Sequence, residues 1–186
     1  MRYLLIFLTF LLMSCGECVD VQIEKNDMGD PLLLCQQNFN VIVDHRIVEE
    51  ELNLIAGAAF YWDDVLDNNY FFQVYPQIQS EEQFAGEIIV KPSEDVKCGA
   101  AAWWDDGDCI VAGIIYINAR CRAMIPGWKE SLYRHEFGHL LGLGHSECDD
   151  DLMAPLLSIS RDDYPVDANP ETIAKLKQLY HDKYGW

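Results

Sequence analysis

Basic residues are scarce in this sequence. Its 186 residues include 13 Lys and Arg against 31 Asp and Glu, which gives a formal net charge of −18. So acidic a surface repels the phosphates of nucleic acids and the headgroups of anionic lipids. We therefore expect no nucleic-acid partner and no direct adsorption to a membrane. The charge favours solubility, and it is suited to cationic substrates and to bound Ca2+.

The sequence also lacks an apolar run that could cross a bilayer, which takes about 20 residues. The N-terminal run Tyr3–Met13 has eleven residues and follows Arg2, which is typical of a secretory signal peptide. No A-x-A cleavage site follows this run. It ends in Leu12-Met13-Ser14-Cys15, which resembles the lipobox of bacterial lipoproteins, in which the cysteine carries the lipid.

We accordingly expect residues 1–14 to be removed and Cys15 to anchor the protein to a bacterial cell envelope. Membrane contact would then come through the N-terminal lipid alone. Gly16, rather than Asp, follows Cys15, which resembles sorting to the outer membrane or cell surface of a Gram-negative cell. The alternative is an ordinary signal peptide cut a few residues later, which would make the protein secreted.

The number of cysteines agrees with lipidation of Cys15. The chain has seven, and six remain for three disulfides in an oxidising compartment. Six cysteines allow 15 connectivities. Our preferred pairs are Cys98 with Cys109, which closes a short loop, and Cys121 with Cys148.

Internal repeats and low-complexity tracts are absent from the sequence, and its length suits one domain rather than two. We expect residues 15–38 to form a tether and residues 39–186 to form a single domain. The expected strands are 39–43, 70–75, 87–91 and 110–118, and the expected helices are 45–66, 128–141 and one that begins at Asn169-Pro170. Asp44 is the expected N-cap of the first helix. The acids of that helix, Glu49–Glu51, lie off its apolar stripe and are expected to be solvated.

Histidine is concentrated in one place. Three of the five histidines fall in the eleven-residue stretch His135-Glu136-Phe137-Gly138-His139-Leu140-Leu141-Gly142-Leu143-Gly144-His145. Residues four apart on a helix stand one above the other, so His135 and His139 can point at one metal ion. Gly142 permits a left-handed turn that ends the helix and brings His145 round as a third ligand. Three neutral nitrogens and one open position are typical of a catalytic zinc. An amphipathic helix that merely carries histidines is the alternative.

This stretch resembles the extended zinc motif of the metzincin metallopeptidases, H-E-x-x-H-x-x-G-x-x-H. Ser146 after the third histidine, and Leu152-Met153-Ala154-Pro155 downstream, are most similar to the matrixin branch. The resemblance implies that Met153 forms the methionine turn beneath the histidines. It further implies an α/β (α+β) fold with a twisted mixed sheet and one antiparallel edge strand. Two long helices would lie in the upper half, with the methionine turn and the C-terminal helix in the lower half.

The resemblance also implies that the substrate cleft borders the edge strand, which we place at residues 99–104. Gly99 and Trp103 are candidates for the substrate pocket, although core packing would explain Trp103 equally well. Pro155, Leu156 and Leu157 are expected to form the outer wall of the pocket. Asp149–Asp151 are expected to be exposed, the alternative being that they orient a ligand histidine. The Asp105–Asp108 turn suits Ca2+, although an exposed acidic turn is the simpler interpretation.

The function that follows is zinc-dependent endopeptidase activity on a peptide or protein substrate. One zinc ion, held by His135, His139 and His145, is expected to lower the pKa of its water and polarise the scissile carbonyl, with Glu136 as general base. We expect a monomer. Two alternatives are a lipid-anchored protein that binds zinc without turnover and a structural lipoprotein whose motif is coincidental.

Overall fold

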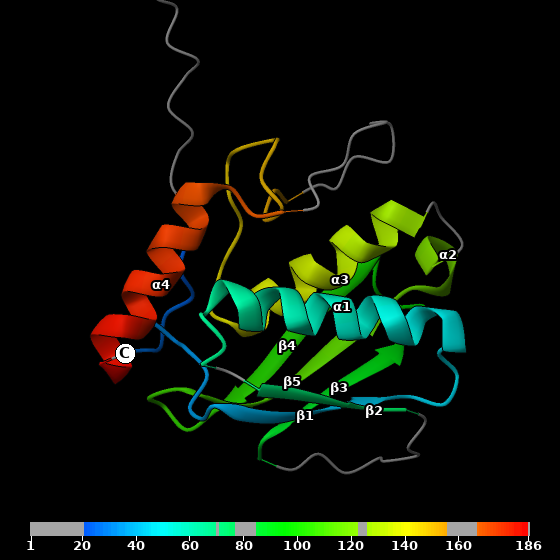
Figure 1. The fold of residues 1–186 in the computed structure, drawn as a ribbon, viewed down its shortest axis with the longest axis horizontal. Coiled ribbons are helices and arrows are strands. Elements are labelled where there is room, and N and C mark those ends of the chain that lie inside the picture. The colour runs from blue at the N-terminus through cyan, green and yellow to red at the C-terminus, as the bar shows by residue number, and fades with distance from the viewer. Residues whose placement is uncertain (1–20, 70, 77–84, 123–125, 156–166, 186) are drawn as a thin grey trace, which may run out of the picture.

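The computed structural model describes residues 21–69, 71–76, 85–122, 126–155 and 167–185. These residues form one five-stranded sheet and four helices, of which α1 and α3 pack on the sheet (Figure 1). The strand order is β2-β1-β3-β5-β4. The strands are β1 (Asn38–Val43), β2 (Phe71–Tyr75), β3 (Glu87–Pro92), β4 (Gly99–Asp105) and β5 (Ile110–Ile117).

The sheet is parallel apart from β4, which pairs antiparallel with β5 and lies at one edge. The predicted α/β fold with one antiparallel edge strand is therefore confirmed, and the edge strand lies at the predicted residues. β5 is buried at nearly every position because it lies between two strands and beneath a helix.

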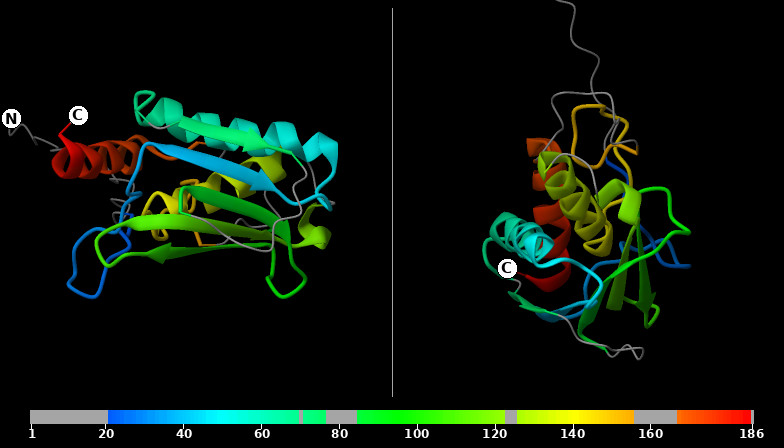
Figure 2. Two further views of the ribbon diagram at one scale, coloured as in Figure 1. Left: turned by 90° about the horizontal axis from the view of Figure 1, so that it is seen from below. Right: turned by 90° about the vertical axis from the view of Figure 1, so that its right-hand side faces the viewer.

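The helices α1 (Glu49–Val65) and α3 (Pro126–Leu140) lie side by side on the same face of the sheet (Figures 1 and 2). Trp62 is fully buried between them, and its indole N–H donates to the carbonyl of Arg134 at 2.8 Å. On the sheet below, Gly113 of β5 leaves room for Leu140, because a Cβ at this glycine would come within 2.8 Å of the leucine side chain. These contacts position α3, which carries two of the histidines.

The first helix differs from its prediction at its N-terminal end. It begins at Glu49, and its N-cap is Val48, which makes no side-chain capping hydrogen bond. The prediction of Asp44 as the cap is wrong, because the Asp44 carboxylate accepts instead from the backbone N–H and guanidinium of Arg46. This pairing lowers the pKa of Asp44 to about 2.

The acidic run of α1 is only partly solvated. Glu49 and Glu50 are exposed as predicted. Glu51, in contrast, is only 2 % exposed and lies against α3, where Lys129 Nζ is 3.0 Å and Tyr133 Oη is 2.7 Å from its carboxylate. The prediction of a solvated Glu51 is therefore wrong, because the helix buries this acid together with a cation and a phenol that satisfy it.

The C-terminal helix α4 (Pro170–Tyr184) has the predicted ends. The Asn169 side chain accepts from the backbone N–H of Thr172, Pro170 occupies the first turn, and Gly185 closes the helix in a left-handed conformation. A short helix, α2 (Ala119–Arg122), links β5 to the segment before α3. Among the described residues, no helix is both long and apolar enough to cross a membrane.

The expected tether, residues 15–38, is packed against the domain over its described part. We call residues 21–34 the N-terminal strap. Val21, Leu32, Leu33 and Leu34 are at most 3 % exposed and belong to the main core. The short apolar patch at residues 32–34 is thus core rather than linker, and the packed domain begins at least as early as Val21.

Two disulfides join described cysteines, Cys35–Cys109 and Cys98–Cys121. Cys148 is also disulfide-bonded. Both preferred pairs from the sequence are therefore wrong. The short-loop argument fails because Cys109 lies where the strap runs beside β5, and Ile110 exchanges backbone hydrogen bonds there with Leu33 and Cys35.

Candidate metal centre

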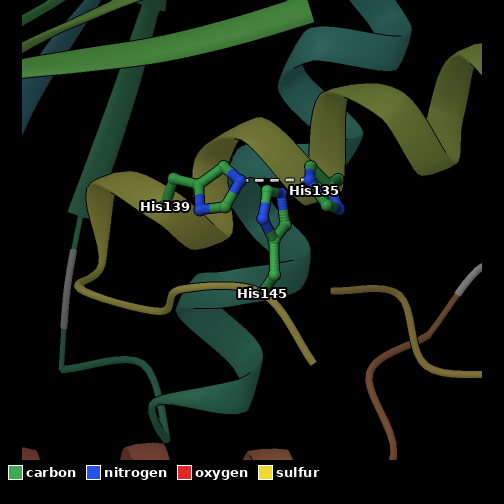
Figure 3. A group of neighbouring side chains, drawn as sticks. All are labelled: His135, His139 and His145. Carbon is green, nitrogen blue, oxygen red and sulfur yellow. Dashed lines mark hydrogen bonds between the residues drawn. The ribbon is translucent and has the colours of Figure 1, made fainter. Parts of the chain in front are cut away.

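The three histidines of the motif converge (Figure 3). His135 and His139 lie one turn apart on α3, and their Nε2 atoms are 3.0 Å from each other. The ring of His145, which follows the helix, has its centroid 5.4 Å from that of His135 and 4.9 Å from that of His139. One nitrogen from each ring lies within 4.8 Å of the others, so the group can hold a metal ion.

The turn after α3 brings His145 back towards the helix. Gly142 has a φ of +90°, a left-handed conformation that glycine adopts without strain. The backbone N–H of Gly142 donates to His139 and that of Leu143 donates to Gly138, which closes the helix end. The predicted left-handed glycine turn is therefore present. It explains how His145, six positions after His139, lies next to the His139 ring.

Hydrogen bonds fix the tautomers of the two helical histidines. His135 Nδ1 is 2.7 Å from the carbonyl of Leu152, and His139 Nδ1 is 2.7 Å from the carbonyl of Leu143. A carbonyl can only accept, so each Nδ1 carries the proton. Each Nε2 therefore presents a lone pair, which is the form that binds a metal ion.

Burial keeps these imidazoles neutral. It lowers the pKa of His135 to about 3 and that of His139 to about 4. The pKa of His145 is also lowered by burial, although the charge of Glu24 opposes this effect. Neutral rings at neutral pH need lose no proton to become ligands.

A bound cation would explain the close approach of the two Nε2 atoms. Two unprotonated nitrogens 3.0 Å apart cannot hydrogen-bond to each other, and their lone pairs repel. Tetrahedral Zn2+ holds nitrogens at 2.0–2.1 Å, which puts two ligands about 3.3 Å apart. The donor set of three imidazoles is that of catalytic zinc sites, and the exposed position of His145 leaves one side open to solvent. The residues present therefore fit zinc.

Glu136 lies beside the histidines on the sheet side of α3. It is 4 % exposed, and burial raises its pKa to about 8. Its Oε2 is buried and has no hydrogen-bond partner in the described part of the chain. An unsatisfied buried carboxyl oxygen is costly and is typical of a functional site rather than of a structural one.

Gly99, at the start of the edge strand, is the close neighbour of Glu136. A Cβ at this position would overlap Glu136 Oε1 and would come within 3.0 Å of Leu132 Cδ1. The glycine therefore allows the edge strand to approach the carboxyl. Trp103, four residues along β4, is half-buried and packs against the core, whereas Trp104 is 49 % exposed.

Met153 lies beneath the histidine helix. It is fully buried, and a Cβ on Gly138 would come within 2.6 Å of its sulfur, so the methionine packs closely against α3 between the two ligands. Its carbonyl accepts from Ser146 N–H at 2.8 Å, which ties the turn to the residue after His145. Pro155 follows the turn and is exposed. Leu156 and Leu157, the other expected wall residues, lie outside the described residues.

Asp151 lies behind the methionine turn and differs from its sequence-based prediction. It is fully buried, and its carboxylate accepts from Met153 N–H, Thr172 Oγ1 and Asn169 Nδ2. The prediction of an exposed Asp151 is therefore wrong, although Asp149 and Asp150 are exposed as predicted. The alternative prediction is that these aspartates orient a ligand histidine. The carbonyl of Leu152, and not the carboxylate of Asp151, contacts and orients His135. A buried acid at the end of three consecutive aspartates leaves no signal in the sequence.

The Asp105–Asp108 turn uses its carboxylates internally. Asp105 Oδ1 accepts from Gly107 N–H, and Asp106 Oδ1 accepts from the N–H groups of Asp108 and Cys109. These hydrogen bonds lower the pKa of Asp106. Such bonds define an exposed acidic turn, and no further observation favours a bound Ca2+ there.

Comparison with known proteins agrees with the geometry of this centre. Residues 127–181 match the family model of the matrixins. This part of the chain is matrixin-like. The match includes α3, the three histidines, the methionine turn and most of α4. It supports a zinc metallopeptidase-like domain, and zinc is the metal that this family implies.

Solved structures resemble the chain at low identity. One, described as the GM1-bound form of the ECX AB5 holotoxin, has a TM-score of 0.57 at 12 % identity and covers 86 % of this chain and 87 % of its own. Another, metalloproteinase-II from Bacteroides fragilis, has a TM-score of 0.46 at 14 % identity and covers 84 % of this chain and 56 % of its own. At such identities the first likeness concerns the fold alone. No curated protein sequence shows significant similarity to the chain.

Proposed function

We propose that the protein is a zinc-dependent endopeptidase. The observation that carries the proposal is the buried Oε2 of Glu136, which has no hydrogen-bond partner among the described residues and lies next to three converging neutral imidazoles. His135, His139 and His145 are the proposed ligands, and Met153 is the apolar support beneath them. Bound zinc would supply Lewis-acid chemistry, which polarises the scissile carbonyl and acidifies a water molecule.

In this proposal Glu136 moves the proton. Its Oε2 accepts the proton of the attacking water and then delivers it to the nitrogen of the leaving amine, so no covalent intermediate forms. The position next to Gly99 places this carboxyl at the start of the edge strand.

The substrate is proposed to be an extended peptide that pairs with β4. Within the described part of the chain this strand pairs with β5 alone and lies at the edge of the sheet, so its other side offers backbone donors and acceptors. Gly99, Trp103, Pro155, Leu156 and Leu157 remain the proposed substrate-pocket residues. The anchoring of the protein to the cell envelope through lipidated Cys15 also remains a proposal.

The test is cleavage of a peptide library by the purified full chain, with Glu136→Ala as the decisive variant. We expect this variant to keep one zinc per chain and to lose about two to four orders of magnitude in rate, the usual contribution of general acid–base catalysis. His139→Ala should lose zinc and activity together. Wild-type protein that binds one zinc but cleaves no peptide would instead favour a zinc-binding protein without turnover.

A further inference from the structure

The N-terminal strap pairs with the loop that carries the third histidine. Gln22 N–H donates to the carbonyl of His145 itself at 3.0 Å, and Gly144 N–H donates to the carbonyl of Gln22 at 2.8 Å. Glu24 N–H donates to the carbonyl of Gly142 at 2.9 Å, and Ile23 and Leu143 form an antiparallel bridge. Residues 22–24 are thus hydrogen-bonded to the backbone of Gly142 and Gly144, on either side of Leu143, and to that of His145.

The strap and the loop are too close for any side chain between them. A Cβ at Gly144 would come within 2.9 Å of Gln22 Cβ and 3.3 Å of Glu24 Oε1. A Cβ at Gly142 would overlap the carbonyl oxygen of Leu32, at the other end of the strap. We call residues 142–145 the ligand loop. Gly142 and Gly144, which shape this loop, are therefore also the points at which the strap contacts it.

His145 depends on such support more than the other two histidines do. His135 and His139 are held by α3, and each ring has a carbonyl that orients it. His145 lies on a loop, and within the described residues its ring makes no hydrogen bond. The position of this imidazole is therefore set by the backbone of residues 142–145.

The strap is itself fixed at both ends. Lys175 of α4 donates to the carbonyl of Val21 at 2.7 Å. At the other end, Leu34 N–H donates to Tyr180 Oη, and Ile110 N–H donates to the carbonyl of Leu33. The disulfide Cys35–Cys109 follows immediately. The strap can therefore transmit the position of α4 and β5 to the ligand loop.

We propose that the N-terminal strap is a positioning element of the metal centre that holds His145 in ligand geometry, so that the zinc affinity of the protein depends on it. The inference rests on the zinc site of the proposed function. It concerns metal binding rather than the reaction. It also means that a chain begun after residue 34 lacks part of its metal centre.

The test compares Gln22→Pro with Gln22→Ala in the full chain. Proline removes the N–H that bonds to the His145 carbonyl, whereas alanine removes the side chain and keeps the N–H. Zinc dissociation constants are measured by competition with a chromophoric chelator, and the visible spectrum of the cobalt-substituted protein reports the coordination. We expect Gln22→Pro to bind zinc about 10–100-fold more weakly, the usual effect of losing a group that orients a ligand. We expect its cobalt spectrum to change, whereas Gln22→Ala should keep the wild-type affinity and spectrum.

A second pair of variants covers the case in which Gln22→Pro does not fold. Gly144→Ala keeps every hydrogen-bonding group and forces the strap and the loop apart, whereas Gly57→Ala places the same methyl group in open space on α1. Only Gly144→Ala should weaken zinc binding. If a folded Gln22→Pro or Gly144→Ala binds zinc with the wild-type affinity, the strap has only a structural role and the proposal is overturned. Wild-type protein that binds zinc but cleaves no peptide would contradict the proposed function and leave this inference intact.

Discussion

Glu136 combines two properties that rarely occur together in a carboxyl group. It is almost completely buried, and its Oε2 has no partner among the described residues. Without a metal ion its pKa is raised to about 8, so the carboxyl is mostly protonated at pH 7. A divalent cation next to a carboxyl favours the charged form and lowers its pKa. Zinc binding and deprotonation of Glu136 are therefore linked.

This linkage predicts proton release on zinc binding. At pH 7 the Glu136 carboxyl should lose about one proton when zinc binds, whereas His135 and His139 should lose none, because their lowered pKa values keep them neutral beforehand. Calorimetric titration with zinc in buffers of different ionisation enthalpy measures the number of protons released. Glu136→Gln should bind zinc and release about one proton fewer than the wild type, because the water acidified by the zinc contributes equally in both proteins. Equal release by the variant and the wild type would assign the proton to another group.

Gly99 carries a second prediction at this scale. A methyl group there would overlap the Glu136 carboxyl, so Gly99→Ala must displace either the carboxyl or the edge strand. We expect kcat/KM to fall at least about tenfold, because a small misplacement of a catalytic group is costly, while one zinc per chain is retained. Metal analysis and peptide kinetics on the same preparation check both parts. Gly57→Ala, in open space, should change neither quantity.

The ligand residues could be predicted because a helix and a left-handed glycine define where three side chains lie from spacing alone. Glu51 and Asp151 could not be predicted in this way. Each lies in an acidic run that resembles a solvated surface, and each is buried by partners remote in the sequence, Lys129 for one and Thr172 for the other. Local pattern contains no information about such partners. The sequence assigns Gly99 and Trp103 to the edge strand. That Gly99 lies against Glu136 whereas Trp103 packs against the core follows only from the packing of α3 on β4.

Among the elements, α1 and α3 are joined by polar as well as apolar contacts. The side chain of Glu51, on α1, faces α3, where Lys129 Nζ and Tyr133 Oη lie within hydrogen-bond distance of its carboxylate. All three groups are largely shielded from solvent. Trp62 is fully buried farther along the same pair of helices, and it supplies both apolar packing and an N–H donor to the carbonyl of Arg134. Together they hold α3, and hence His135, in place beside α1.

Removing Glu51 should therefore destabilise the domain. Glu51→Ala leaves Lys129 and Tyr133 without the carboxylate that satisfies them, and we expect the free energy of unfolding to fall by about 2–4 kcal/mol. Urea denaturation measured by circular dichroism gives this value. The neighbouring exposed acid provides the control, since Glu50→Ala should change the free energy by at most about 0.5 kcal/mol. Equal effects of the two substitutions would show that the buried cluster contributes no net stability.

The predicted strands and helices are all present in the described residues, because apolar periodicity and the proline and glycine stops mark them well. The first helix is the exception at its start, where the carboxylate of Asp44 pairs with Arg46 rather than capping the helix. The strap was missed for another reason. Its three leucines are too few to show a period, and they are buried only because β5 and α4 lie beside them.

At the scale of the whole molecule, the disulfide Cys35–Cys109 joins residues 74 positions apart, whereas Cys98–Cys121 joins residues 23 apart. A cross-link restricts the unfolded chain more when its loop is longer, by about 4.5 and about 3.5 kcal/mol respectively in the chain-entropy model. The longer loop connects the end of the strap to the sheet.

We therefore expect Cys35→Ser/Cys109→Ser to lower the free energy of unfolding by more than Cys98→Ser/Cys121→Ser, with a difference of about 1 kcal/mol. Chemical denaturation of the two metal-free double variants provides the comparison. A loss of under about 1 kcal/mol for the longer loop would mean that contacts in the strap, and not the cross-link, constrain this part of the chain.

The early start of the packed domain limits how far an anchored enzyme could reach. With Cys15 lipidated as proposed, only residues 15–20 separate the lipid from Val21, whose carbonyl is already bonded to α4. Six residues span at most about 20 Å even when fully extended. Gln22, the next residue of the strap, is bonded to His145, so the histidine centre would lie within a few nanometres of the bilayer. The natural substrates would then be proteins or peptides at that surface.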